Sequence, residues 1–468
     1  MMKGSVDGVQ ENINEPKQPD AKLASKTLHV LFLSLLIDLI AFSSILPLMP
    51  VILEHYRDTD SKDGLYHTIQ RHIQYFATSI HAPGTTRYNT VFFGGALGSM
   101  YCFLQFLMGP FFGACSDSYG RRPLILISMI GISMSYAVWA FSGSFILFVL
   151  SRAIGGISRA NVSLWTAVVS DVTEEKKRNK GMALIGIAFS VGFVLGPMLG
   201  AFMSKRDFFE SGFVHFQPAI TALTISLVNL LFVYYTLPET HQPGKSPGTS
   251  KEIVNKALRL INPLHLFSFR TTGVSDKEYD EKLQKLSLVY FLYLLLFSGV
   301  EFTLSFLTRE RYQYTSMQQG LMYFYIGSIM IVIQGGYFRR LPAGSEIKCA
   351  LQGLTAVAIS TLMMAMFTDQ HTYYAALGLY SFGSATVVPS LTSVVSHYGS
   401  AEHKGKLIGI FRSIGALARS FGPFLACSAF WTHGTLCYYM SAVLLIIPLV
   451  ILMRVRHTGT GLKNVKKE

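Results

Sequence analysis

The chain has 468 residues, of which half are hydrophobic and only 14% are charged, and its mean hydropathy is positive. Soluble proteins of this length carry about a quarter charged residues, so this composition excludes an ordinary soluble domain and is typical of a polytopic membrane protein. The formal charge of +13 does not indicate nucleic-acid binding, because the basic residues lie in short loops between apolar segments.

The first 27 residues are polar and contain no apolar core of a cleavable signal peptide, so we expect the first span to direct its own insertion. A membrane-spanning helix needs about 20 mainly apolar residues. Twelve segments meet this requirement: 28–53, 88–112, 124–142, 145–170, 181–203, 215–237, 286–307, 318–338, 346–367, 372–396, 406–431 and 435–453. The sequence therefore predicts an all-α protein with twelve transmembrane helices.

The long polar stretch 238–285, which includes a possible amphipathic segment at Ile253–Leu266, divides the spans into six and six. The predicted organisation is a tail (1–27), a six-helix half (28–237), a central loop (238–285), a second six-helix half (286–453) and a second tail (454–468). If both termini and the central loop lie in the cytosol, the cytosolic segments hold 28 basic residues and the opposite loops hold 8. The positive-inside rule therefore favours this orientation.

The two halves resemble each other at a constant offset of 226 residues. Gly94 matches Gly320, Gly109 matches Gly335, and the segment KGMALIGI recurs later as KGKLIGI. Several matches in register indicate a duplicated six-helix unit, an arrangement found in many transporters.

The loop between the second and third spans reads GACSDSYGRRP. Its residues Gly113, Asp117, Gly120, Arg121 and Arg122 resemble the signature loop of the major facilitator superfamily. This resemblance implies a latch that holds the two halves together when the transporter faces outward. The alternative is a positively charged loop that only sets the topology. The matching stretch of the second half, GGYFRRL, has no aspartate at the corresponding place, so we expect an asymmetric latch.

Four other motifs follow the pattern of twelve-span drug:proton antiporters in this superfamily. They are DLIAFSSILPLMP from Asp38, RAIGG from Arg152, the Gly-Pro motif GFVLGPMLG, and PET at 238–240. The Gly-Pro motif contains the helix-packing residues Gly192, Gly196, Pro197 and Gly200. Together with the segment 290–307, these motifs resemble those of the tetracycline-transporter-like proteins of animals. This resemblance implies that the chain carries organic anions.

Six charges fall in the interior of the predicted spans, away from their ends: Asp38, Arg152, Arg159, Glu301, Arg412 and Arg419. Each costs at least ~2.5 kcal/mol near the bilayer centre and therefore needs a partner or a wet cavity. A carboxylate there has its proton affinity raised by desolvation and lowered by a nearby arginine. We expect Asp38 or Glu301 to exchange a proton, with Arg152 acting on Asp38. The alternative is a set of fixed salt bridges between helices.

Four arginines against two carboxylates leave the intramembrane set at +2, which favours an anionic ligand. Arginine also matches carboxylate, sulfate or phosphate groups with its planar fork. We expect Arg159 and Arg419 to anchor the anion, with Arg412 either contacting the substrate or reaching the cytosolic interface. Four further residues are expected to bind substrate or only to pack helices together: Gln105, Gln334, Phe302 and Tyr380.

The sequence thus predicts a transporter of organic anions or amphipathic drugs that works by alternating access with proton coupling. A lysophospholipid carrier of the same fold and a receptor that does not transport remain alternatives. No nucleophile–base set, nucleotide loop or metal-ligand spacing is evident, so we expect no enzyme activity, cofactor or metal. The expected partners are the substrate, protons and the lipid bilayer, with the chain acting as a monomer. The plasma membrane is favoured, and an endoplasmic-reticulum, nuclear-envelope or endolysosomal address stays open.

Overall fold

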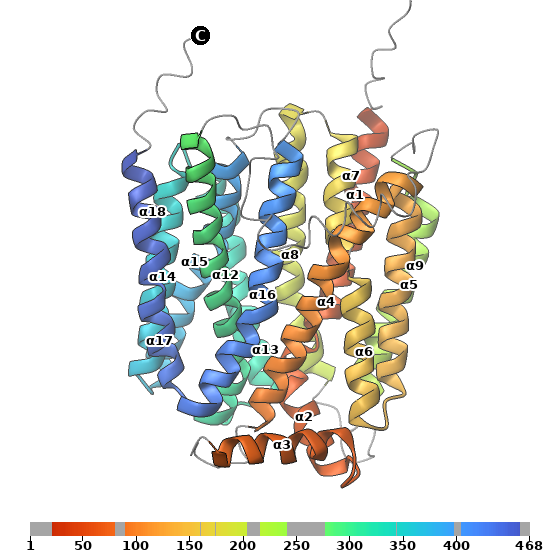
Figure 1. Cartoon of the computed structure of the whole chain (residues 1–468). Coiled ribbons are helices and arrows are strands. Elements are labelled where there is room, and N and C mark those ends of the chain that lie inside the picture. The colour runs from red at the N-terminus through yellow and green to blue at the C-terminus, as the bar shows by residue number, and fades with distance from the viewer. Residues whose placement is uncertain are drawn as a thin grey trace, which may run out of the picture.

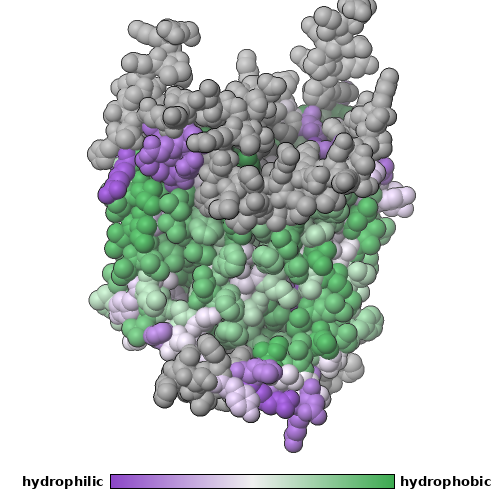
Figure 2. Space-filling view, in the orientation of Figure 1, coloured by the Kyte–Doolittle hydropathy of each residue, from purple (hydrophilic) through white to green (hydrophobic). Residues whose placement is uncertain are grey.

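The computed structural model describes residues 21–79, 89–159, 161–173, 175–203, 216–240, 277–342, 344–396 and 404–458. Within these ranges every regular element is a helix. The long helices run side by side in one bundle, and the start of the first and the end of the last lie at the same end of it (Figure 1). Figure 2 shows a hydrophobic belt around the middle of the bundle and hydrophilic residues at its two ends. The protein is a polytopic helical membrane protein.

The N-terminal half begins with a span that is broken near its outer end. Its helices are α1 (Ala21–Ser43), η1 (Leu46–Leu48), α2 (Met49–Thr59), α3 (Leu65–Ser79), α4 (Asn89–Tyr119), α5 (Arg121–Ala140), α6 (Phe145–Ser158), α7 (Asn161–Val172), α8 (Glu175–Met203) and α9 (Phe216–Thr236). The break between α1 and α2 coincides with Pro47 and Pro50, because proline cannot donate its backbone nitrogen to a helical hydrogen bond.

The C-terminal half repeats the pattern with other irregularities. Its helices are α12 (Lys277–Arg311), α13 (Ser316–Val332), the π-helix η5 (Ile333–Tyr337), η6 (Phe338–Arg340), α14 (Glu346–Met366), α15 (Gln370–Ser396), α16 (Lys404–His433), α17 (Leu436–Leu444) and α18 (Ile446–Thr458). The last span breaks at Leu445, three residues before Pro448.

The described helices are consistent with the twelve predicted spans. Ten helical segments are long and apolar enough to cross a membrane. The remaining two helices that overlap predicted spans, α15 and α16, have 27 and 30 residues, which is also long enough to cross a membrane. α12 begins at Lys277, nine residues before the expected start of the second half. The possible amphipathic segment Ile253–Leu266 lies outside the described residues.

The long loop after the first span contains a helix that the sequence analysis did not predict. α3 lies across the end of the bundle opposite the termini (Figure 1). Tyr66 at its start is fully buried and stacks on Phe93 of α4, with ring centroids 4.4 Å apart. Asp60 accepts a hydrogen bond of 3.1 Å from the backbone nitrogen of Tyr66. The start of α3 is therefore anchored to the N-terminal half.

The two halves contact each other through repeat-related glycines. A Cβ atom on Gly94 of α4 would lie 2.6 Å from Phe306 of α12, and a Cβ atom on Gly320 of α13 would lie 3.0 Å from the carbonyl oxygen of Pro197 of α8. Small residues let helix backbones approach closely in membranes. The duplicated sequence thus produces two equivalent contacts between the halves, one on each side of the bundle.

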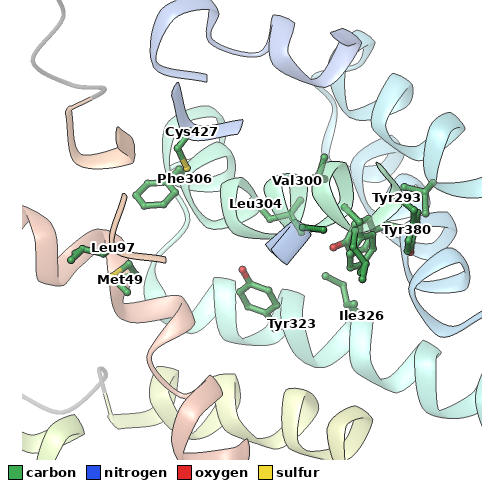
Figure 3. Packing of buried hydrophobic residues seen from close by; sticks show 14 of the residues in the cluster. Met49, Leu97, Tyr293, Val300, Leu304, Phe306, Tyr323, Ile326, Tyr380 and Cys427 are labelled. Atoms are coloured by element: carbon green, nitrogen blue, oxygen red, sulfur yellow. The ribbon is translucent and has the colours of Figure 1, made fainter. Parts of the chain in front are cut away.

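These contacts lie toward the α3 end of the bundle, and the hydrophobic core that joins the two halves lies at the same end. One cluster of buried residues joins both halves, with Met49 and Leu97 of the first half grouped with Phe306 and Cys427 of the second (Figure 3). The other end of the N-terminal half has a separate cluster, which includes Leu35. All of its members belong to the N-terminal half. The apolar cores of the two halves are therefore continuous near α3 and separate near the termini.

Candidate functional site

A buried ion pair lies at the centre of the N-terminal half. Arg159 Nη2 is 3.0 Å from Asp38 Oδ2, and only 4% and 6% of the two side chains are exposed. The Arg159 guanidinium also lies over the Phe42 ring, 4.0 Å from its centroid. Removing two opposite charges from water is tolerated when they neutralise each other at close range. This pair is therefore sealed from solvent.

The position of Arg159 depends on a break in the fourth span. α6 ends at Ser158, and Arg159 has the non-helical angles φ −82° and ψ 54°. The Ser128 hydroxyl of α5 donates a hydrogen bond of 2.6 Å to the carbonyl oxygen of Ser158. The carbonyl freed by the break is thus satisfied, as membrane interiors require.

Arg152 does not take the place beside Asp38 that the sequence analysis gave it. Its guanidinium lies over the rings of Trp139 and Phe148, 5.0 and 5.5 Å from their centroids. Its Nε donates a hydrogen bond of 3.3 Å to the Ser151 hydroxyl. In this conformation the helix break at Arg159 brings Arg159, rather than Arg152, to Asp38, and an action of Arg152 on Asp38 stays a prediction.

The C-terminal half carries an acid and an arginine of its own in a different state. Glu301 of α12 is half-buried and Arg419 of α16 is exposed. The two side chains interact electrostatically, but among the described residues neither has a partner within ion-pair distance. The Cys102 thiol of α4 is within electrostatic range of Glu301, Arg419 and Arg159. Both acid–arginine sets therefore lie near one point on α4.

Three tyrosines from different helices surround Glu301 within electrostatic range: Tyr293, Tyr323 and Tyr380. Figure 3 shows Tyr293 beside Tyr380, with Tyr323 on the neighbouring helix. Tyr380 is 2% exposed and its ring is stacked on Phe297, 4.8 Å between centroids. In this conformation Tyr380 therefore packs in the core, and a substrate contact there stays a prediction.

The aromatic ring of Phe302 fills a place between the halves. A Cβ atom on Gly98 of α4 would lie 2.6 Å from this ring. Nearby, the Ser99 hydroxyl accepts a hydrogen bond of 2.8 Å from the backbone nitrogen of Phe424 on α16. Phe302 thus packs at the junction of α4, α12 and α16, on the side where the halves are closed.

The other predicted substrate residues lie nearer the termini. Arg412 Nη1 donates a hydrogen bond of 2.6 Å to the Thr166 hydroxyl of α7. Gln334 Oε1 accepts a hydrogen bond of 2.6 Å from the Ser190 hydroxyl of α8. Both contacts join the two halves through side chains. Gln105 is half-buried on α4 and makes no side-chain hydrogen bond to a described residue.

The charged loop between α4 and α5 forms a cluster around Arg121. Its guanidinium bonds Asp117 at 2.7 Å and Asp171 at 2.9 Å. The Glu239 carboxylate accepts hydrogen bonds from the backbone nitrogens of Arg121 and Arg122, at 2.9 and 3.1 Å, and so caps the start of α5.

All described partners of Arg121 belong to the N-terminal half, so this part of the predicted latch holds α4, α5 and α7 together here. Gly120 has φ +98°, a conformation that favours glycine, and a Cβ atom there would lie 2.7 Å from Glu239. Gly113 has open space beside it. Arg122 donates a hydrogen bond of 2.8 Å to the carbonyl oxygen of Tyr234.

The glycines of α8 lie where this helix contacts α1. A Cβ atom would lie 2.5 Å from Leu39 at Gly192 and 2.7 Å from the carbonyl oxygen of Ile40 at Gly196. At Gly200 it would clash with the backbone of Ser44. The motif therefore allows close approach of α8 to the broken first span.

Sequence reasoning missed several polar partners. Asp171 and Glu239 complete the cluster around Arg121, and Glu54 of α2 forms an ion pair of 2.9 Å with Arg309 of α12. For Asp171 and Glu239 a signal existed, because both are acidic residues at the same membrane face as the arginines. For Glu54 and Arg309 the signal was weaker, since both lie just beyond the ends of predicted spans.

Two pseudo-symmetric six-helix halves that enclose intramembrane charges define a membrane transporter rather than an enzyme. The profile of the Major Facilitator Superfamily matches residues 31–423. The chain belongs to this superfamily.

Full-length relatives support the assignment. The chain is 42% identical over 454 residues to major facilitator superfamily domain-containing protein 10 of Mus musculus, covering 96% of this chain and 97% of that protein. It is 24% identical over 332 residues to the class B tetracycline resistance protein of Escherichia coli, covering 71% of this chain and 77% of the relative. The crystal structure of the human organic anion transporter MFSD10 (TETRAN) superposes with a TM-score of 0.77 at 42% identity, covering 92% of this chain and 99% of that chain.

Proposed function

We propose that the protein transports small organic anions across a membrane by alternating access and that protons drive this transport. The observation that carries the proposal is Arg419, an exposed arginine that forms no ion pair with any described residue and lies within electrostatic range of Glu301. A cation held inside the bilayer region is costly and is kept where it binds a ligand or meets water. The organic anion transporter similar to this chain supports the same substrate class.

The charge balance of the bundle supports an anionic substrate. Asp38 neutralises Arg159, which leaves three arginines and one carboxylate, and hence a net charge of +2. Arg152 is buried against aromatic rings and does not face solvent. The accessible part of this positive charge therefore comes from Arg412 and Arg419, both on α16 of the C-terminal half.

The arrangement of the halves supports alternating access. They share one apolar core at the α3 end, whereas the N-terminal half has a core of its own at the other end. With the termini in the cytosol, as the basic loops favour, this conformation is closed to the outside and loosely joined on the cytosolic side. In the opposite state we expect Asp117 and Arg121 to engage the C-terminal half.

Glu301 is the carboxyl group best placed to exchange the coupled proton. It is half-buried and lies near Arg419 without a paired cation, whereas Asp38 is held by Arg159 at 3.0 Å. A proton carrier needs access to solvent in at least one state. Asp38 is the second candidate, because its ion pair would have to open before it could take a proton.

The experiment uses the purified chain in liposomes with an imposed pH gradient. The probes are 1-naphthalenesulfonate and trimethyl-1-naphthylammonium, which share a ring system and carry permanent opposite charges. We expect gradient-dependent movement of the anion alone, and its loss in Arg419→Gln. Movement of the cation alone would contradict the charge argument, and movement of a labelled lysophospholipid instead would identify the amphiphile carrier.

A further inference from the structure

The two acid–arginine sets of this duplicated protein differ in accessibility. In the N-terminal half, Asp38 and Arg159 are paired and almost fully buried. In the C-terminal half, Glu301 is half-buried and Arg419 is exposed, and they lie beyond ion-pair distance. A ligand that needs an arginine therefore meets only one of these two guanidinium groups.

The exposed face of Arg419 points between the helices rather than toward lipid. Gly415 and Gly422 lie four residues before and three residues after Arg419, so the three share one face of α16. Both glycines face α12, because a Cβ atom on Gly415 would lie 2.7 Å from the Tyr290 ring and one on Gly422 would clash with the carbonyl oxygen of Leu295. This face of α16 therefore looks toward α12.

The neighbouring turn of α16 reaches the N-terminal half. The carbonyl oxygen of Pro423, four residues after Arg419, would be 2.8 Å from a Cβ atom on Gly95 of α4. Cys102 of α4 is within electrostatic range of Arg419. Arg419 is thus exposed in a space bordered by α4, α12 and α16.

The groups that face Glu301 leave Arg419 as its main electrostatic partner. The tyrosines near it are Tyr293 of its own helix, Tyr323 of α13 and Tyr380 of α15, and α4 contributes the Cys102 thiol. These four groups are uncharged at neutral pH. From α16, Arg419 supplies the positive charge.

The charged or titratable groups on the other helices that pack against α12 are engaged elsewhere. Glu54 of α2 is paired with Arg309, and the Tyr438 hydroxyl of α17 bonds the Thr303 hydroxyl at 2.9 Å. Arg454 and Arg456 of α18 lie in its last turns, near the terminal end of the bundle. Arg412 of α16 is also within electrostatic range of Arg419 and keeps its positive charge at neutral pH. Protonation of Glu301 is therefore the step that changes the local charge around Arg419.

We propose that the charged group of the substrate anion binds to Arg419 in the C-terminal half alone, and that it binds when Glu301 is protonated. This inference rests on the proposed function. An ionised Glu301 competes with the substrate anion, because it cancels the net positive charge of Arg419 and its carboxylate repels a second carboxylate or sulfonate at short range. Protonation leaves Arg419 as a net positive charge with its planar fork free. Proton and anion therefore occupy the site together.

The test measures equilibrium binding of 1-naphthalenesulfonate to the purified full chain between about pH 5.5 and pH 8. This sulfonate keeps its charge throughout, so any pH dependence belongs to the protein. If one protein group must take up a proton, Kd rises with pH by at most about tenfold per unit. Glu301→Gln should bind tightly at every pH, and should lose gradient-driven transport. Arg419→Gln should weaken binding at least about tenfold, with Arg419→Lys between the two.

Arg71→Gln is the matched control, because Arg71 is an exposed arginine on α3 far from the bundle interior. The inference is overturned if Glu301→Gln keeps the wild-type pH slope, or if Arg419→Gln and Arg419→Lys bind like the wild type. Size-exclusion profiles and melting temperatures show whether each variant is folded. If Arg419→Gln is not folded, the pH dependence of Kd in Glu301→Gln tests the inference by itself. Wild-type protein that moves no organic anion in liposomes would instead refute the proposed function itself.

Discussion

An acidic residue and an arginine interact in two places in this protein, and the two pairs differ in the distance between their charges and in their exposure to solvent. Asp38 and Arg159 are 3.0 Å apart and sealed, so each compensates the desolvation of the other. Glu301 and Arg419 interact without forming an ion pair, so their charges remain available to solvent and ligand. Distance and exposure, rather than residue type, separate a structural pair from a binding pair.

The first pair predicts a strong dependence of stability on both partners. Asp38→Asn should leave Arg159 as an uncompensated buried charge and lower the free energy of unfolding by about 3–5 kcal/mol. Arg159→Gln should do the same to Asp38. The double variant should recover most of this loss, because no lone charge remains. Thermal unfolding in detergent measures the cycle, and losses that simply add would show that the two residues do not stabilise each other.

Only part of this site could be predicted at the level of single residues. All six intramembrane charges are visible in the sequence, because charged residues stand out in apolar segments. Their partners are not visible, because the pairing of Asp38 with Arg159 depends on a helix break at Arg159 itself. Tyr380 illustrates the same limit, since spacing cannot distinguish a ring that stacks in the core from one that lines a site.

Helix contacts, by contrast, follow closely from sequence. The glycines of α8 predict close packing, and the structure places Gly196 where a Cβ atom would lie 2.7 Å from a carbonyl oxygen of α1. The α1 backbone cannot move aside as a flexible side chain can, so the added methyl group would clash with it. Gly196→Ala should therefore destabilise the protein by about 1–3 kcal/mol. Gly186→Ala on the same helix is the control, because nothing lies within 4 Å of its added methyl group. Equal melting temperatures for the two variants would contradict this account of the motif.

The start of α5 offers a second test at the same scale. Glu239 caps it by accepting hydrogen bonds from two backbone nitrogens, and this carboxylate also complements the helix dipole. Glu239→Ala should cost about 0.5–2 kcal/mol of stability, the usual range for loss of a cap. Thr240→Ala provides the neighbouring control, because the Thr240 hydroxyl has no hydrogen-bond partner. The comparison is made by melting temperature, and a larger loss in Thr240→Ala would refute the cap.

At the scale of the whole molecule, the duplicated sequence predicts two similar halves but not how they are joined. Gly94 and Gly320 occupy matching positions of the sequence repeat and make equivalent contacts, because each packs against the opposite half at the α3 end. The conformation of the assembly depends instead on unique contacts that have no repeat partner, such as Arg412 with Thr166. Under the proposed alternating access, these contacts would differ between the states of the transport cycle, and one sequence encodes every state.

The ion pair between Glu54 and Arg309 is the polar contact that should bias this equilibrium. It joins α2 of one half to α12 of the other at 2.9 Å, on the side where the halves are closed. If this side opens during transport, the pair must separate. Its side chains are 32% and 37% exposed, so the pair contributes no more than about 1 kcal/mol, which corresponds to a population shift of up to about fivefold.

Glu54→Gln and Arg309→Gln should therefore each increase the open population on the α3 side by up to about fivefold, and the charge swap Glu54→Arg with Arg309→Glu should restore it. Distances between spin labels at Thr59 and His371, which are exposed residues of opposite halves near this face, measure the two populations. The shift should shrink at high salt, because exposed charges are screened. If the single variants leave the distance distribution unchanged at low salt, the closed state is held by apolar packing of α4, α12 and α16 alone, and this ion pair has no part in gating.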